Sequence, residues 1–108
     1  MAKNSIPDDV KAKVKAIVEK FNQKESRYPD THFFAVRFRG AYAYLDRHEG
    51  HIVSQNGRVT WTGDMNSWNF AIYKYSSGSY DPNEWMFPGS EHLNGTVEGA
   101  LRACLEAY

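Results

Sequence analysis

The chain has 108 residues, with 13 basic and 13 acidic side chains, so its formal net charge is zero. That length corresponds to one domain, 1–108, and the balanced charge argues against a nucleic-acid partner. The single cysteine excludes an internal disulfide and a structural zinc site built on thiolates. Because no apolar run is long enough to span a membrane and the first residues do not resemble a signal peptide, we expect a soluble, cytoplasmic protein without a cofactor.

Residues 7–25 have the pattern of an amphipathic helix. Its apolar positions recur at helical spacing and form one stripe, made of Val10, Val14, Ile17, Val18 and Phe21. Pro7 suits a first helical turn, and Asp8 and Asp9 place negative charge at the positive end of the helix dipole. Basic side chains exceed acidic ones over residues 1–27, which indicates either a docking surface for an acidic partner or a solvated helix face.

Residues 32–75 have the pattern of antiparallel strands. A two-residue turn at Arg39 and Gly40 would place Val36 opposite Ala43 and sort alternate side chains onto two unlike faces. One face is apolar, with Phe34, Val36, Phe38, Ala43 and Leu45. The other is aromatic and charged, with Phe33, Arg37, Tyr42, Tyr44 and Asp46. Since burial sets the register, we expect the apolar face to pack against the helices.

Later signals complete the fold prediction. Asn56 and Gly57 predict a turn, residues 58–62 and 68–75 predict two further strands, and the turn-rich residues 76–95 predict a long connection. Thr96 is a suitable N-cap for a second amphipathic helix, whose stripe is Val97, Ala100, Leu101, Cys104, Leu105 and Tyr108. The predicted fold is α+β, a four-stranded antiparallel meander with an N-terminal and a C-terminal helix packed on one sheet face as a two-layer sandwich.

Several strings resemble a group of short prokaryotic proteins with no assigned activity. The resemblance covers residues 33–108 and is carried by Phe38-Arg39-Gly40, Thr62-Gly63-Asp64, the run from Phe70 to Ser76, and Gly95-Thr96-Val97-Glu98-Gly99-Ala100. It implies that the strands and the second helix form one unit. It implies no activity, cofactor or site residue.

Candidates for metal binding and catalysis are few. His48 and His51, with Asp46 or Glu49, are either a metal site or a solvated loop, because their spacing matches no established zinc motif. Cys104 lies on the apolar helix stripe, where a thiol is typically buried and inert. Asp46 and Asp64 are the best carboxylates for acid–base chemistry, but Asp64 follows Gly63, as is typical of a local turn. We therefore expect no enzyme.

The second sheet face is the main candidate for binding. It carries Arg37, Tyr42 and Tyr44, and Tyr73 and Tyr75 are expected to join them. Tyrosine and arginine are enriched at protein interfaces, so one hypothesis is a non-enzymatic interaction module that forms a homodimer or binds another protein through this face.

The long connection offers an alternative use of that face. Trp85, Met86 and Phe87 are too apolar to remain in water and could cover the face as a lid. In that case a small ligand or substrate would bind between the face and residues 80–92.

Overall fold

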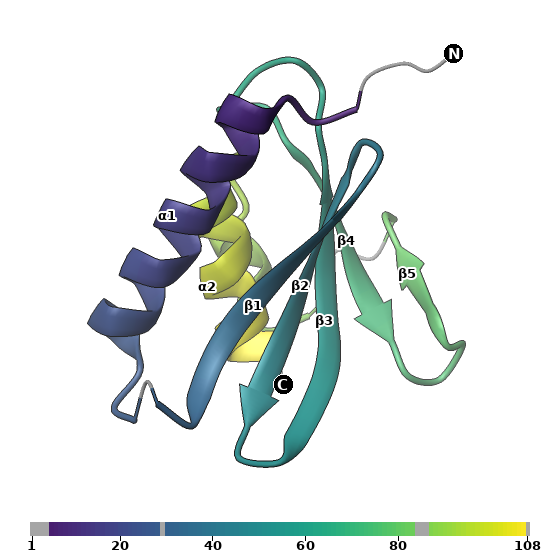
Figure 1. Ribbon diagram of the computed structural model, residues 1–108. Coiled ribbons are helices and arrows are strands. Elements are labelled where there is room, and N and C mark those ends of the chain that lie inside the picture. The colour runs from purple at the N-terminus through teal and green to yellow at the C-terminus, as the bar shows by residue number, and fades with distance from the viewer. Residues whose placement is uncertain (1–4, 29, 84–86, 108) are drawn as a thin grey trace.

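A computed structural model describes residues 5–28, 30–83 and 87–107 of the chain. In chain order the elements are α1 (Asp8–Glu25), β1 (His32–Arg39), β2 (Tyr42–Glu49), β3 (Ile52–Thr60), β4 (Asn69–Lys74), β5 (Ser79–Asp81), the short 3-10 helix η1 (Ser90–His92) and α2 (Val97–Ala107). The strands form one antiparallel sheet in the order β1-β2-β3-β4-β5, with α1 and α2 on the same side of it (Figure 1). The predicted α+β class is confirmed, with five strands instead of four.

Helix α1 packs its predicted stripe against the sheet. Val10, Val14, Val18 and Phe21 are buried, while Ile17 is partly buried against the same core. Two of the basic side chains, Lys11 and Lys15, hold their ammonium groups 5.8 and 5.9 Å from the centre of the Phe38 ring. These lysines therefore cover an aromatic ring at the margin of the core. In the described part of the chain, no helix has the length and apolarity needed to cross a bilayer.

The first hairpin turns at Gly40 and Ala41, not at Arg39 and Gly40 as the sequence predicted. Arg39 pairs with Tyr42, and Val36 pairs with Leu45, so the pairing differs from the prediction by two residues. Because side chains alternate with a period of two, this shift leaves each of them on its predicted face. Gly40 has φ +59°, a left-handed conformation that glycine adopts without strain.

The turn predicted at Asn56 and Gly57 is wrong. Both residues lie inside β3, and the chain reverses at Gly50 and His51. The pairing of β2 with β3 skips Asn56, since Leu45 faces Gly57 and the next residue of β2 faces Gln55. The dipeptide therefore forms a β-bulge in mid-strand.

The bulge lets α2 approach the sheet closely. Asn56 is buried, and its Nδ2 donates a hydrogen bond to the carbonyl oxygen of Cys104 at 3.3 Å. A Cβ added to Gly57 would lie 2.8 Å from the Cys104 Sγ and 2.8 Å from a ring atom of Phe70. Asn56 and Gly57 therefore pack against α2 and do not form a turn.

The remaining strands and α2 complete the layer. Val59 pairs with Phe70, and the rings of Trp61 and Trp68 lie 5.0 Å apart, so these four side chains share one face. The N–H of Gly99 donates to the Thr96 Oγ1 at 3.0 Å, which is the predicted N-cap. Tyr108 lies outside the described residues.

The core lies between the helices and one face of the sheet, which we call the helix-covered face. Its least exposed large side chains include Leu45, Val59, Ile72, Val14, Val97 and Leu101. Cys104 is buried among them, as its place on the helix stripe predicted.

Candidate functional site

Figure 1 shows both helices on one side of the sheet, and the strand register places tyrosine and arginine side chains on the opposite face. We call this surface the tyrosine face and define it by Arg37, Arg39, Tyr42, Tyr44, Asp46, Gln55, Arg58, Ala71, Tyr73, Tyr75 and Tyr80. The structure thus brings together five residues that the sequence singled out, namely Arg37, Tyr42, Tyr44, Tyr73 and Tyr75. The sequence prediction missed Arg58 and Tyr80.

The tyrosine rings form a connected layer with Tyr80 at its centre. The ring of Tyr80 lies 5.3 Å from that of Tyr44 and 5.0 Å from that of Tyr73, and Tyr73 lies 4.8 Å from Tyr75. These are tilted or edge-to-face contacts, the favourable geometry for aromatic pairs. Ala71, beneath the layer, is only 2% exposed. The tyrosine face is therefore packed although no helix of the described residues covers it.

Arg37 and Asp46 form an ion pair within this layer. The Arg37 Nε donates to the Asp46 Oδ2 at 2.6 Å, and a terminal nitrogen donates to the Oδ1 at 3.2 Å. The hydrogen bond to Asp46 raises the pKa of Arg37, and the guanidinium also lies 4.7 Å from the centre of the Tyr44 ring. Because both carboxylate oxygens are engaged, Asp46 acts as the charge partner of Arg37.

Arg58 is held differently. Its guanidinium carbon lies 4.4 Å from the centre of the Tyr42 ring and 5.4 Å from that of Tyr80. Its Nε is buried without a hydrogen-bond partner, and no carboxylate within the described ranges forms an ion pair with it. Arg58 is therefore a stacked cation whose charge is not neutralised by these residues.

Tyr80 keeps its proton more firmly than an ordinary tyrosine. Its pKa is raised, first by burial of the phenol and then by the negative charge of Asp46. The Gln55 Nε2 donates to the Tyr80 hydroxyl at 3.4 Å. At neutral pH, Tyr80 is thus an uncharged phenol at the centre of the face.

The segment expected to cover the tyrosine face is described only in part. Phe87 lies with its ring 6.1 Å from that of Phe70, whose strand partner Val59 is in the core. Phe87 thus packs on the helix-covered side of the sheet, not over the tyrosines. Trp85 and Met86 lie outside the described residues.

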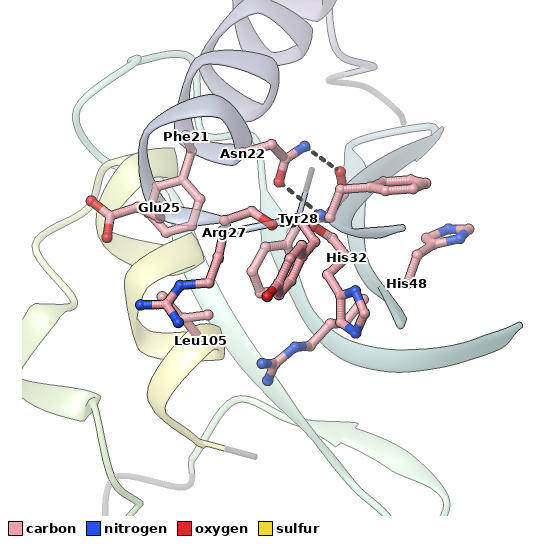
Figure 2. A pocket seen from close by; sticks show the side chains of 12 residues that line it. Phe21, Asn22, Glu25, Arg27, Tyr28, His32, His48 and Leu105 are labelled. Carbon is pink, nitrogen blue, oxygen red and sulfur yellow. Dashed lines mark hydrogen bonds between the residues drawn. The ribbon is translucent and has the colours of Figure 1, made fainter. Parts of the chain in front are cut away.

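A separate pocket of about 200 Å³ lies where the C-terminal part of α1 meets the ends of β1 and β2 (Figure 2). Phe21, Phe34 and Leu105 contribute apolar surface, and Arg27, His32 and His48 contribute polar groups. Asn22 fixes the wall, because its side chain accepts from the N–H of Phe34 and donates to its carbonyl, each at 2.8 Å. This pocket is not the one predicted between the tyrosine face and residues 80–92.

The histidines proposed as metal ligands are not brought together. His48 stacks on Phe33 with ring centres 4.6 Å apart, whereas His51 lies in the hairpin turn. Among the described residues, the group that could hold a metal ion is formed by Glu91, His92 and Glu106, whose ligand atoms all lie within 4.8 Å of one another. The sequence did not reveal them because Glu106 is far along the chain from the other two.

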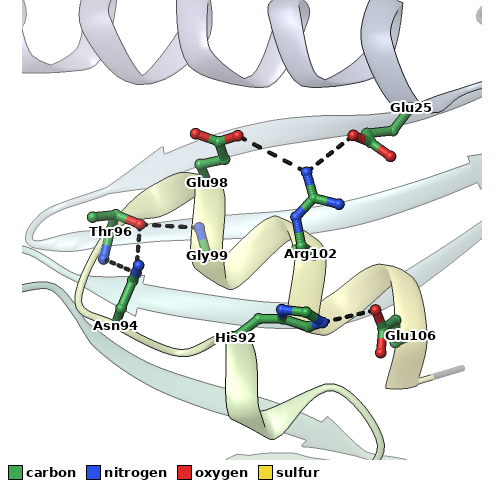
Figure 3. Close-up of polar contacts among 8 residues, drawn as sticks. All are labelled: Glu25, His92, Asn94, Thr96, Glu98, Gly99, Arg102 and Glu106. Carbon is green, nitrogen blue, oxygen red and sulfur yellow. Dashed lines mark hydrogen bonds and ion pairs between the residues drawn. The ribbon is translucent and has the colours of Figure 1, made fainter.

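Contacts of His92 and Arg102 join η1 and the end of α1 to α2 (Figure 3). The His92 Nε2 and the Glu106 Oε2 are 2.7 Å apart, and Arg102 contacts Glu25 at 3.0 Å and Glu98 at 3.9 Å. The hydrogen bond from Arg102 lowers the pKa of Glu25. The contacts drawn in Figure 3 thus hold the segment before α2 and the end of α1 against one helix.

The other two candidates for catalysis are Asp64, which makes a local turn contact, and Cys104, which is buried. The Asp64 Oδ1 accepts the N–H of Asn66 at 2.8 Å, which is the turn role predicted for it. Burial raises the pKa of the Cys104 thiol. A buried, protonated thiol is a poor nucleophile.

No family model, curated protein or solved structure matches this chain. The function proposed below is therefore inferred from the positions and contacts of the side chains described above.

Proposed function

We propose that the chain is a single-domain, non-enzymatic interaction module that docks a protein partner on the tyrosine face. The supporting observation is a packed layer of tyrosine and arginine side chains on the sheet face opposite the two helices that the structure describes. Such side chains are the usual anchors of protein interfaces, since they bury a large area and still offer polar groups. With a single unpaired cysteine, the protein suits a reducing compartment, and we place it in the cytoplasm.

The orientation of the rings favours a protein over a single-stranded nucleic acid. Base stacking needs open ring faces. Arg58 lies over the ring of Tyr42, and Arg37 lies over that of Tyr44. These two rings already have a guanidinium as their stacking partner.

Site-specific photo-crosslinking in cells tests this function. A benzophenone amino acid replaces Tyr42 or Tyr75, which are 37% and 57% exposed. Lys13, exposed on the outer side of α1, is the control position. We expect covalent adducts from positions 42 and 75 that are absent or much weaker from position 13.

The mass of the adduct identifies the class of partner. An adduct of twice the chain's mass would show that the face makes a homodimer, and any other protein mass would show a different partner. Equal yields from positions 42, 75 and 13 would contradict the proposed function, because the tyrosine face would then meet proteins no more often than the rest of the surface.

A further inference from the structure

We infer that the partner presents an acidic segment to the tyrosine face and that Arg58 binds one of its carboxylates. This inference rests on the proposed function and specifies the chemistry of the partner. It is carried by the unpaired, stacked guanidinium of Arg58 and by the charges that surround it.

The tyrosine face has an excess of positive charge. Three of its residues are arginines, and Asp46 is the one acid among them. Asp46 is bound to Arg37, so Arg39 and Arg58 have no neutralising carboxylate among the residues described. The whole chain is neutral, so this excess is a local property of the face. A partner of complementary charge is therefore acidic.

Arg58 is prepared to bind an anion. Its Nε is buried, and its guanidinium carbon lies close to the rings of both Tyr42 and Tyr80. A buried N–H without an acceptor is unfavourable, and most buried polar groups in proteins have a partner. The terminal nitrogens have no hydrogen-bond partner among the described residues and, unlike the Nε, are not fully buried. A carboxylate arriving from outside can accept from them.

A carboxylate fits this position better than a neutral acceptor does. The planar guanidinium offers two parallel N–H donors, which match the two oxygens of a carboxylate, and such charge-assisted bonds are stronger than neutral ones. The fold already contains this arrangement, because Arg37 holds Asp46 through two nitrogens. Because the Arg58 Nε is buried, we expect Arg58 to hold an aspartate or glutamate of the partner through its two terminal nitrogens.

Nuclear magnetic resonance titration of the full chain tests the inference. The probe is N-acetylated hexaglutamate amide, with hexaglutamine as the uncharged control and oligouridylate as the nucleic-acid control. We expect hexaglutamate to shift the amide signals of β2, β3 and β4 saturably, with an affinity that falls as salt is added. Neither control should cause these shifts.

Two substitutions on the same face separate a specific contact from general attraction. Arg58→Gln should weaken hexaglutamate binding about tenfold, as expected for the loss of a charge-assisted pair. Arg39→Gln removes the same charge from an exposed arginine that is not stacked, and should weaken binding less than about threefold. Arg58→Lys keeps the charge and loses the planar fork, so it should not restore full affinity.

The outcomes distinguish failure of the inference from failure of the proposed function. Equal effects of Arg58→Gln and Arg39→Gln, or binding of oligouridylate without hexaglutamate, would overturn the inference. So would the absence of hexaglutamate binding while crosslinks still form at positions 42 and 75, which would leave the docking function intact with a partner that is not acidic. Amide spectra of each variant verify the fold, and if Arg58→Gln is unfolded, Arg58→Lys against Arg39→Lys provides the comparison.

Discussion

The two faces of the sheet come from the same strands and both contain many aromatic rings, yet they are built for different surroundings. On the helix-covered face, Leu45 and Val59 are almost fully buried and have no polar atoms in their side chains. On the tyrosine face, each ring carries a hydroxyl group, and guanidinium groups stack on Tyr42 and Tyr44. A tyrosine can pack its ring and keep its hydroxyl hydrated, so this layer is packed and still faces water. Under the proposed function, stability and recognition thus belong to opposite faces of the sheet.

The largest expected effect comes from neighbouring residues of β2. Leu45→Ala should lower the free energy of unfolding by about 2–5 kcal/mol, because it leaves a cavity under the helices. Tyr44→Ala, one residue earlier and on the tyrosine face, should cost clearly less, because Tyr44 is only partly buried. Urea unfolding of both variants measures the difference. Equal losses would show that the tyrosine layer contributes to stability as the core does.

An intermediate effect is expected where the helix-covered face is most tightly packed. Gly57→Ala should lower the free energy of unfolding by about 1–3 kcal/mol, because its Cβ would meet the Cys104 Sγ and the Phe70 ring. Ser54→Ala, in the same strand, is the matched control and should change stability by less than about 0.5 kcal/mol. An unchanged midpoint for Gly57→Ala would mean that α2 is not held against the bulge.

The smallest effect concerns pH and the tyrosine face. Because the pKa of Tyr80 is raised in the folded chain, the unfolded chain loses this proton first. Stability is thus unaffected well below the ordinary tyrosine pKa of 10.0 and falls as the pH rises above it. Tyr80→Phe should make that alkaline loss shallower.

Urea unfolding at a series of alkaline pH values gives this slope, and phenolate absorbance follows the ionisation. The buried Cys104 thiol contributes in the same direction in both proteins, so the comparison isolates Tyr80. Identical slopes for the two proteins would contradict the burial of the phenol.

The sequence predicts the two sheet faces correctly because side chains alternate between the faces, so an error of two residues in the strand register does not move a side chain to the other face. The sequence predicts the first turn one residue too early, which changes the pairing of β1 with β2 by two residues. Tyr44 and Leu45 therefore still lie on the sheet faces predicted for them. The two helices could also be predicted from the sequence, because their apolar stripes and the Thr96 cap are signals between residues close together in the chain.

What the sequence could not reveal depends on contacts between distant residues. Asn56 and Gly57 form a common turn dipeptide, and only the approach of α2 makes them a bulge. The three residues of β5 carry too little pattern to be recognised in a turn-rich segment. Without β5, neither the position of Tyr80 nor the stacking of Arg58 could be predicted.

The position of α2 has a consequence for how the chain is made. It is synthesised after all five strands, yet it supplies Leu101 and Cys104 to the core and joins α1 through the Arg102 contact with Glu25, 77 residues away. A nascent chain that has emerged only as far as β5 still lacks these contacts, and its apolar sheet surface is exposed to solvent and to other nascent chains. Ribosome pausing before residue 97 would therefore prolong an aggregation-prone state.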